Sequence, residues 1–215
     1  MKLLLINPNT SEATTQAMRQ IAQDAAPQGV AVTALTAPTG VPMIVNAGQL
    51  AQSARVLEAS LPHYRNLACD GVIVSAFGDP GLLALGKGLP CPVVGIGESS
   101  MLEARDRGPF AVVTTTPDLA APIEALAAGL GLCELFTGLW LTQGDPQQLL
   151  TDPAHMEAEL EAACRRAMAH PDLGSIIIGG GPLATAARAL SAKLHFPIIE
   201  PVPAAVKRLV ALLKG

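Results

Sequence analysis

Polar side chains that could bind or activate a small molecule stand directly after several apolar runs of the sequence. Asn9 follows one such run, Ser75 ends a second, and Thr114 and Thr115 follow a third. Hydroxyl and amide groups in such places can donate hydrogen bonds to a ligand and stabilise charge that develops on a carbonyl oxygen. We therefore expect Asn9, Ser75, Thr114 and Thr115 to contact a substrate.

Three carboxylates near the same kind of strand end are candidate catalytic groups. Glu200 directly follows the apolar pair Ile198–Ile199, where burial would raise its pKa and let it act as a general base. Glu98 and Asp79 are the other two candidates. Asp79 and Glu98 each have a structural alternative, because Asp79 stands among glycines in a turn and Glu98 could cap the helix that follows.

Glycines next to these strand ends could let the backbone approach a ligand closely. We expect Gly78, Gly180 and Gly181 to do so, with Pro182 at the first position of a helix whose free N–H groups face the ligand. The run of three glycines lacks the G-x-G-x-x-G spacing of a dinucleotide site. The pattern therefore favours a small ligand over a nucleotide cofactor.

The elements that must position these residues alternate along the chain. Short continuous apolar runs are typical of parallel strands buried on both faces, and helical segments lie between them. The expected strands are Lys2–Ile6, Val30–Leu35, Gly71–Ser75, Val93–Ile96, Phe110–Val113, Ser175–Ile178 and Ile198–Ile199. The expected helices are Glu12–Ala26, Gln49–Ala68, Met101–Arg107, Asp118–Leu130, Met156–His170, Pro182–Lys193 and Ala204–Leu213. This order predicts an α/β fold.

The strand ends repeat about halfway along the chain. Asn7 and Thr114 are 107 residues apart, Val74 and Ile177 are 103 apart, and Pro92 and Pro197 are 105 apart. We interpret the chain as two lobes of one design, residues 1–97 and 98–203, with the helix in 204–215 packing back on the first. Ligands of open parallel sheets bind outside the carboxyl ends of the strands. The site is therefore expected in the cleft between the lobes.

Composition narrows the class of protein. The 215 residues are 50% hydrophobic and only 3% aromatic, with a net charge of −4, which disfavours a nucleic-acid partner. No apolar run reaches the ~20 residues of a membrane span, so we expect a cytoplasmic protein. Four cysteines show no metal-type or redox-type spacing and are expected to pack as small hydrophobes: Cys69, Cys91, Cys133 and Cys164.

The same loops resemble those of the aspartate/glutamate/hydantoin racemase superfamily, and most of all its hydantoin and allantoin racemase branch. The matching segments are Leu5–Ser11, Phe77–Leu82, Pro92–Glu98, Val112–Thr115 and Pro197–Glu200 followed by Ala204–Lys207. The resemblance implies two flavodoxin-like lobes related by a pseudo-twofold axis, an amino acid or five-membered cyclic ureide as substrate, and no cofactor. We also expect a homo-oligomer.

The resemblance also implies two catalytic cysteines, one from each lobe, that act as acid and base on opposite faces of a carbon. In this sequence Ala76, just before Phe77, occupies the first position, and Gly180 occupies the second, or Gly179 or Gly181 if the register shifts by one residue. Two-thiol racemisation is therefore excluded. We nevertheless expect Ala76, Phe77 and Gly180 to line the substrate site.

Three functions remain open from the sequence. The leading hypothesis is cysteine-independent hydrolysis of a hydantoin-like or thiohydantoin-like ring, or action on an amino-acid-like carboxylate, with Glu200 as base. The first alternative is a racemase or isomerase whose acid and base are not thiols. The second is a catalytically silent protein that binds a small ligand.

Overall fold

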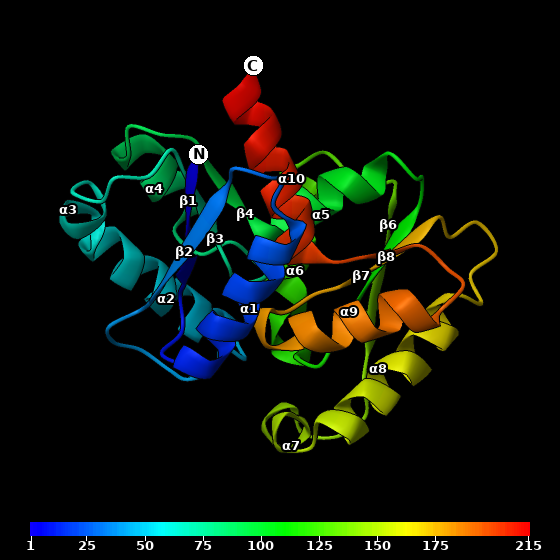
Figure 1. The fold of residues 1–215 in the computed structure, drawn as a ribbon. Coiled ribbons are helices and arrows are strands. Elements are labelled where there is room, and N and C mark those ends of the chain that lie inside the picture. Colours follow the sequence, from blue (N-terminus) through cyan, green and yellow to red (C-terminus); the bar gives the residue numbers. More distant parts are fainter.

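The computed structural model describes residues 1–215 and contains two four-stranded parallel sheets flanked by helices (Figure 1). The first sheet has the order β2-β1-β3-β4 and the second the order β6-β5-β7-β8. The strands are β1 (Lys2–Asn7), β2 (Ala31–Thr36), β3 (Gly71–Val74), β4 (Val93–Gly95), β5 (Phe110–Thr114), β6 (Phe136–Leu141), β7 (Ser175–Ile178) and β8 (Ile198–Ile199). The predicted α/β class with two parallel-sheet lobes is confirmed.

Helices connect the strands and cover both faces of each sheet. They are α1 (Glu12–Ala25), α2 (Ala47–Ala59), α3 (Leu61–Tyr64), α4 (Leu82–Gly88), α5 (Ile96–Arg105), α6 (Ala120–Gly129), α7 (Pro146–Thr151), α8 (Pro153–Ala167), α9 (Ala184–Lys193) and α10 (Pro201–Lys214). Two short 3-10 helices, η1 (Pro117–Leu119) and η2 (Gly181–Leu183), precede α6 and α9. None of the helices combines the length and apolar character that crossing a membrane requires.

The two halves repeat the same pairing, which fixes the equivalent positions. Ile6 pairs with Val74 in the first sheet, and Val113 pairs with Ile178 in the second. Val74 is therefore equivalent to Ile178, and the predicted match of Val74 with Ile177 was one residue out of register. The corrected offset of 104 residues places Ala76 opposite Gly180.

The last helix of each half packs on the other half. Val206 and Leu209 of α10 are fully buried against the first sheet, where they contact side chains such as Leu5. In the same way Met101 of α5 is buried against Phe110 and other residues of the second sheet. The two helices lie side by side at the junction of the sheets (Figure 1), so α5 and α10 join the lobes into one body.

Several elements differ from the sequence expectation. β6, α4 and α7 were not predicted, and α5 begins at Ile96 rather than Met101. β6 is an edge strand whose residues are all half-buried, so it has no continuous apolar run.

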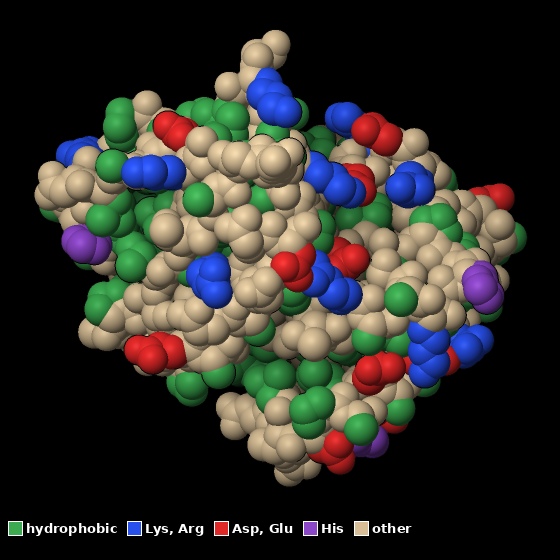
Figure 2. Space-filling view, viewed as in Figure 1, with side chains coloured by type: hydrophobic (Ala, Val, Ile, Leu, Met, Phe, Trp, Pro, Cys, Tyr) green, Lys and Arg blue, Asp and Glu red, His purple; other side chains and the backbone are tan.

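On the face drawn in Figure 2, basic and acidic side chains are interspersed rather than segregated.

Candidate functional site

A narrow cavity lies between the two sheets, at the carboxyl ends of the four central strands β1, β3, β5 and β7. Its volume is about 30 Å³, by a measure in which one water needs roughly 10–15 Å³. The residues that line it are Asn9, Met43, Ile44, Ser75, Ala76, Phe77, Thr114, Thr115, Thr116, Leu119, Ile123, Gly179, Gly180, Gly181, Pro182 and Leu183. No Cys, His, Asp, Glu, Lys, Arg or Tyr is among them.

The polar side chains of the cavity are oriented by short hydrogen bonds. The Asn9 Oδ1 atom accepts the Asn7 side-chain amide at 2.8 Å and the Ser11 N–H at 2.9 Å. The Asn9 amide nitrogen has no such partner and remains available as a donor. The Ser75 hydroxyl donates to the Ile6 carbonyl at 2.9 Å. Ser11 caps α1, and the Asn9 side chain lines the cavity.

Threonines supply the hydroxyl groups of the second lobe. Thr114 and Thr116 are joined by a hydrogen bond of 3.1 Å between their hydroxyls. All three consecutive threonines, Thr114–Thr116, are at most 5% exposed, although Thr116 was not predicted. Hydroxyls can donate as well as accept, so they adapt to either kind of ligand atom.

Backbone N–H groups add more donors to the cavity. Within the loops after β3, β5 and β7, six lining residues make no hydrogen bond through their backbone N–H groups: Ala76, Phe77, Thr115, Thr116, Gly180 and Gly181. A cavity with unpaired N–H donors on opposite walls is suited to carbonyl or carboxylate oxygens.

Two glycines allow the loops of the lobes to touch across the cavity. A Cβ on Gly181 would lie 2.9 Å from the Ser75 carbonyl oxygen and 2.9 Å from the Met18 sulfur. A Cβ on Gly179 would lie 3.1 Å from the Phe77 ring. The small residues therefore reflect close packing of the two loops as well as access for a ligand.

Gly78 is the one predicted binding residue outside this lining. It has φ +102°, and a Cβ there would contact Leu50 at 3.0 Å. It faces a second, wider hollow of about 500 Å³ between α2, α4 and α6. The other nine predicted binding residues, from Asn9 to Pro182, lie together in the cavity.

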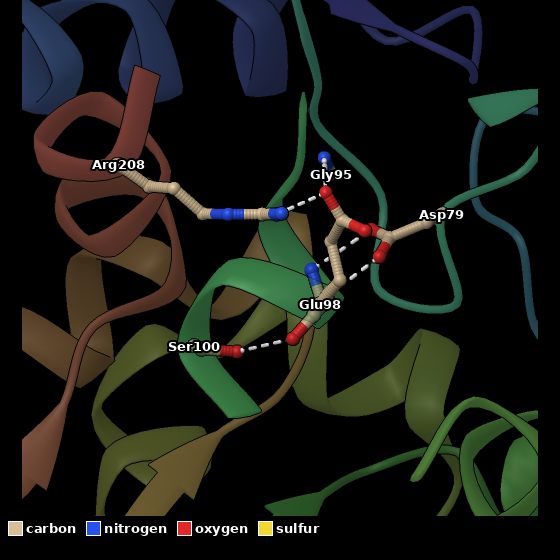
Figure 3. A network of polar contacts seen from close by, with 6 residues as sticks. Asp79, Gly95, Glu98, Ser100 and Arg208 are labelled. Atoms are coloured by element: carbon tan, nitrogen blue, oxygen red, sulfur yellow. Dashed lines mark hydrogen bonds and ion pairs between the residues drawn. The ribbon is translucent and has the colours of Figure 1, made fainter. Parts of the chain in front are cut away.

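Asp79 and Glu98 line the second, wider hollow and are not among the residues that line the narrow cavity. The Asp79 carboxylate accepts the Gly97 and Glu98 N–H groups at 2.8 and 2.6 Å. Burial raises the pKa of Asp79 to about 7, opposed by these two hydrogen bonds. The Glu98 carboxylate pairs with Arg208 on α10 and accepts the Gly95 N–H (Figure 3).

Glu200 lies at the start of α10, away from the cavity. Its Oε2 atom is 3.5 Å from the Arg188 guanidinium of α9, which also binds Asp24 of α1 at 2.7 Å. Glu200 follows β8, an edge strand, whereas the cavity lies at the ends of the central strands. None of the three predicted catalytic carboxylates is therefore among the residues that line the narrow cavity.

The four cysteines are also outside the cavity. Cys164 is buried in the core of the second lobe, and Cys69 and Cys91 are partly buried before β3 and β4. Burial raises the pKa of Cys91 to about 11, with further contributions from Cys69. Cys133 is exposed, contrary to the expectation that all four pack as hydrophobes.

Apolar lining residues were missed by the sequence reasoning. Met43 and Ile44 come from the segment between β2 and α2, Leu119 is the last residue of η1, and Ile123 lies in the first turn of α6. The sequence signal for these is weak, because buried apolar side chains in loops and helices look the same whether they face a core or a ligand. The chemically informative residues were at the strand ends.

This geometry is shared with known proteins. The sequence matches the Asp/Glu/Hydantoin racemase family over residues 3–209, and the chain belongs to that family of enzymes. It is 29% identical to a hydantoin racemase of Pseudomonas sp. (strain NS671) and 27% identical to one of Paenarthrobacter aurescens, covering 96% of this chain and 84% and 89% of those proteins.

A solved structure of a similar protein has the same fold. The allantoin racemase from Klebsiella pneumoniae superposes with a TM-score of 0.93 at 31% identity, over 100% of this chain and 88% of that one. The predicted superfamily and its hydantoin and allantoin branch are confirmed.

Proposed function

We propose that this chain binds a small five-membered cyclic ureide in the cavity between its lobes and transfers no proton with its own side chains. The observation that carries this proposal is the chemistry of the lining. The cavity has many neutral hydrogen-bond donors and not one side chain that titrates near neutral pH.

The donors favour a ligand that presents several oxygen acceptors. The Asn9 amide, the threonine hydroxyls and the free N–H groups of three loops surround a narrow space. A hydantoin-type ring is planar and carries two carbonyl oxygens on opposite sides of one ring nitrogen. Loops from both lobes could bind the two carbonyls together, and the names of the relatives, hydantoin and allantoin racemase, support the same ligand class.

No side chain that lines this cavity is suited to transfer a proton. An acid–base catalyst must come within about 2.6–3.2 Å of the proton it moves. Ala76 and Gly180, where the family resemblance implies thiols, supply a methyl group and a hydrogen atom. The hydrolytic hypothesis loses its base as well, since Glu200 binds Arg188 outside the lining.

The ligand must be small, and one wall of the cavity must move outward to admit it. Met43 and Ile44 belong to the loop between β2 and α2, whereas the other walls are strand ends and helix starts. Loops adapt more readily than the elements they connect. We expect this loop to move outward on binding and expect 5-methylhydantoin to bind more tightly than hydantoins with bulky substituents.

Calorimetric titration with 5-methylhydantoin, allantoin and L-aspartate tests the proposal. We expect the two ureides to bind and Thr115→Val to weaken their binding roughly tenfold through the loss of one hydrogen bond. Thr151→Val on exposed α7 is the matched control and should bind as the unmodified chain does. Binding of aspartate alone, or of none of the three compounds, would contradict the proposal.

A further inference from the structure

The carboxylate of Asp79 joins a cavity loop to a helix of the lobe junction. It accepts the N–H groups of Gly97 at 2.8 Å and Glu98 at 2.6 Å, both in the first turn of α5 (Figure 3). The Asp79 backbone N–H donates to the Ala76 carbonyl at 3.0 Å. One residue therefore closes the turn that carries Ala76 and Phe77 and also caps α5.

The surroundings of Asp79 are shaped to hold its side chain. A Cβ on Gly95 would lie 2.1 Å from the Asp79 carboxyl carbon, and one on Gly97 would lie 3.0 Å from an Asp79 oxygen. Asp79 has φ +50° and is the only residue other than glycine with a positive φ. Strained backbone of this kind persists only where the surrounding structure enforces it.

The second half of the chain lacks this arrangement. The turn from Ala76 to Asp79 corresponds to the turn from Gly180 to Leu183, since both are closed by an N–H donating three residues back. Leu183 is buried and apolar, and α10 has no side-chain cap at its start. The carboxylate that caps a helix of the lobe junction is therefore a feature of the first half alone.

The helix that Asp79 caps is seated on the opposite lobe. Met101 and Ala104 of α5 are fully buried in a core cluster that includes Phe110 and Ile177 of the second sheet, and also Phe77. The capping bonds therefore fix the cavity loop of the first lobe relative to the sheet that carries the facing wall.

We propose that Asp79 is a positioning residue for ligand binding: its capping of α5 holds the loop after β3 so that the Ala76 and Phe77 N–H groups face the ligand. This inference rests on the proposed function, because it assigns a role in that same cavity. Asp79 itself does not touch the ligand.

The charge of Asp79 should then govern affinity. Two good acceptor oxygens exist only in the carboxylate form, and burial raises the pKa of this group to about 7. The charged groups that face it are Glu98 on α5, Arg208 on α10 and Glu58 on α2, while α4 and α6 present only apolar residues and glycine. Ligand affinity should therefore fall as the pH is lowered through about 7.

Titration of 5-methylhydantoin between pH 5.5 and 8.5 tests this with Asp79→Asn. The variant keeps the shape but presents an amide N–H to one of the α5 donors, so we expect roughly tenfold weaker binding at pH 8 and no pH dependence. Asp152→Asn is the matched control, because Asp152 caps α8 at the His155 N–H, far from the cavity. A second variant, Gly97→Ala, presses on the carboxylate and should weaken binding in the same direction.

Hydrogen exchange separates failure of this inference from failure of the proposed function. If the unmodified chain binds neither ureide, the proposed function is wrong, and Asp79→Asn should still speed exchange of the residue 75–81 amides. Unchanged exchange in that segment would overturn the positioning role. If the unmodified chain does bind, a folded Asp79→Asn protein with unchanged affinity and an unchanged pH profile would overturn it.

Discussion

Replacing Asp79 by Asn should change how the stability of the protein depends on pH. Burial raises the pKa of Asp79 from 3.8 to about 7, so between these values the folded chain holds a proton that the unfolded chain has released. Stability from this group is fully present below pH 3.8 and is lost as the pH rises through 7. From pH 5 to pH 8 the loss is about 2–3 kcal/mol.

Asn does not titrate, so Asp79→Asn lacks that loss. Its altered hydrogen bonds to Gly97 and Glu98 contribute a constant destabilisation of about 1–3 kcal/mol, which does not depend on pH. Urea unfolding of both proteins at pH 5, 6, 7 and 8 measures the difference in their free energies of unfolding. We expect this difference to shift by about 2–3 kcal/mol in favour of the variant across the series. A constant difference would refute the account of the buried carboxylate.

Three further substitutions or modifications have defined outcomes. Glu200→Gln should leave ureide affinity unchanged and lower the free energy of unfolding by at most about 1 kcal/mol, because its pair with Arg188 is partly exposed; a tenfold loss of affinity measured by calorimetry would return Glu200 to the site. Iodoacetamide at pH 7.5 should modify exposed Cys133 and leave binding intact; loss of binding traced by mass spectrometry to Cys91 would contradict this. Gly181→Ala should destabilise the chain by about 1–3 kcal/mol in urea unfolding, since its Cβ meets a backbone oxygen at 2.9 Å, whereas Gly86→Ala in open space should not; equal effects would refute the close-packing argument.

Much of the fold could be predicted from the sequence, because buried parallel strands are continuous apolar runs and their ends repeat. β6 was missed because Gly138, with φ +117°, interrupts a half-buried edge strand. The start of α5 was placed five residues too late for a different reason. Its first turn contains Gly97, which disfavours a helix locally, and the group that caps it, Asp79, is 18 residues away.

The polar lining could also be predicted, since hydroxyl and amide side chains directly follow the central strands. The sequence could not show which way the side chains of the candidate catalytic carboxylates point. Glu200 follows an edge strand, and only the strand order shows that its side chain meets α9 and not the cavity. Glu98 pairs with Arg208 from a helix 110 residues later, a contact created by the packing of α10 on the first lobe.

Solvent exchange at the ring carbon tests the central claim most directly. The sample is 5-methylhydantoin in D2O at neutral pH with an excess of the protein, followed by proton NMR. We expect the ligand signals to broaden on binding, while the C5 proton disappears no faster than in protein-free buffer. Ala76→Cys, which restores one thiol to the lining, should accelerate its loss. Exchange by the unmodified chain well above the free rate would contradict the claim that no side chain of this cavity transfers a proton.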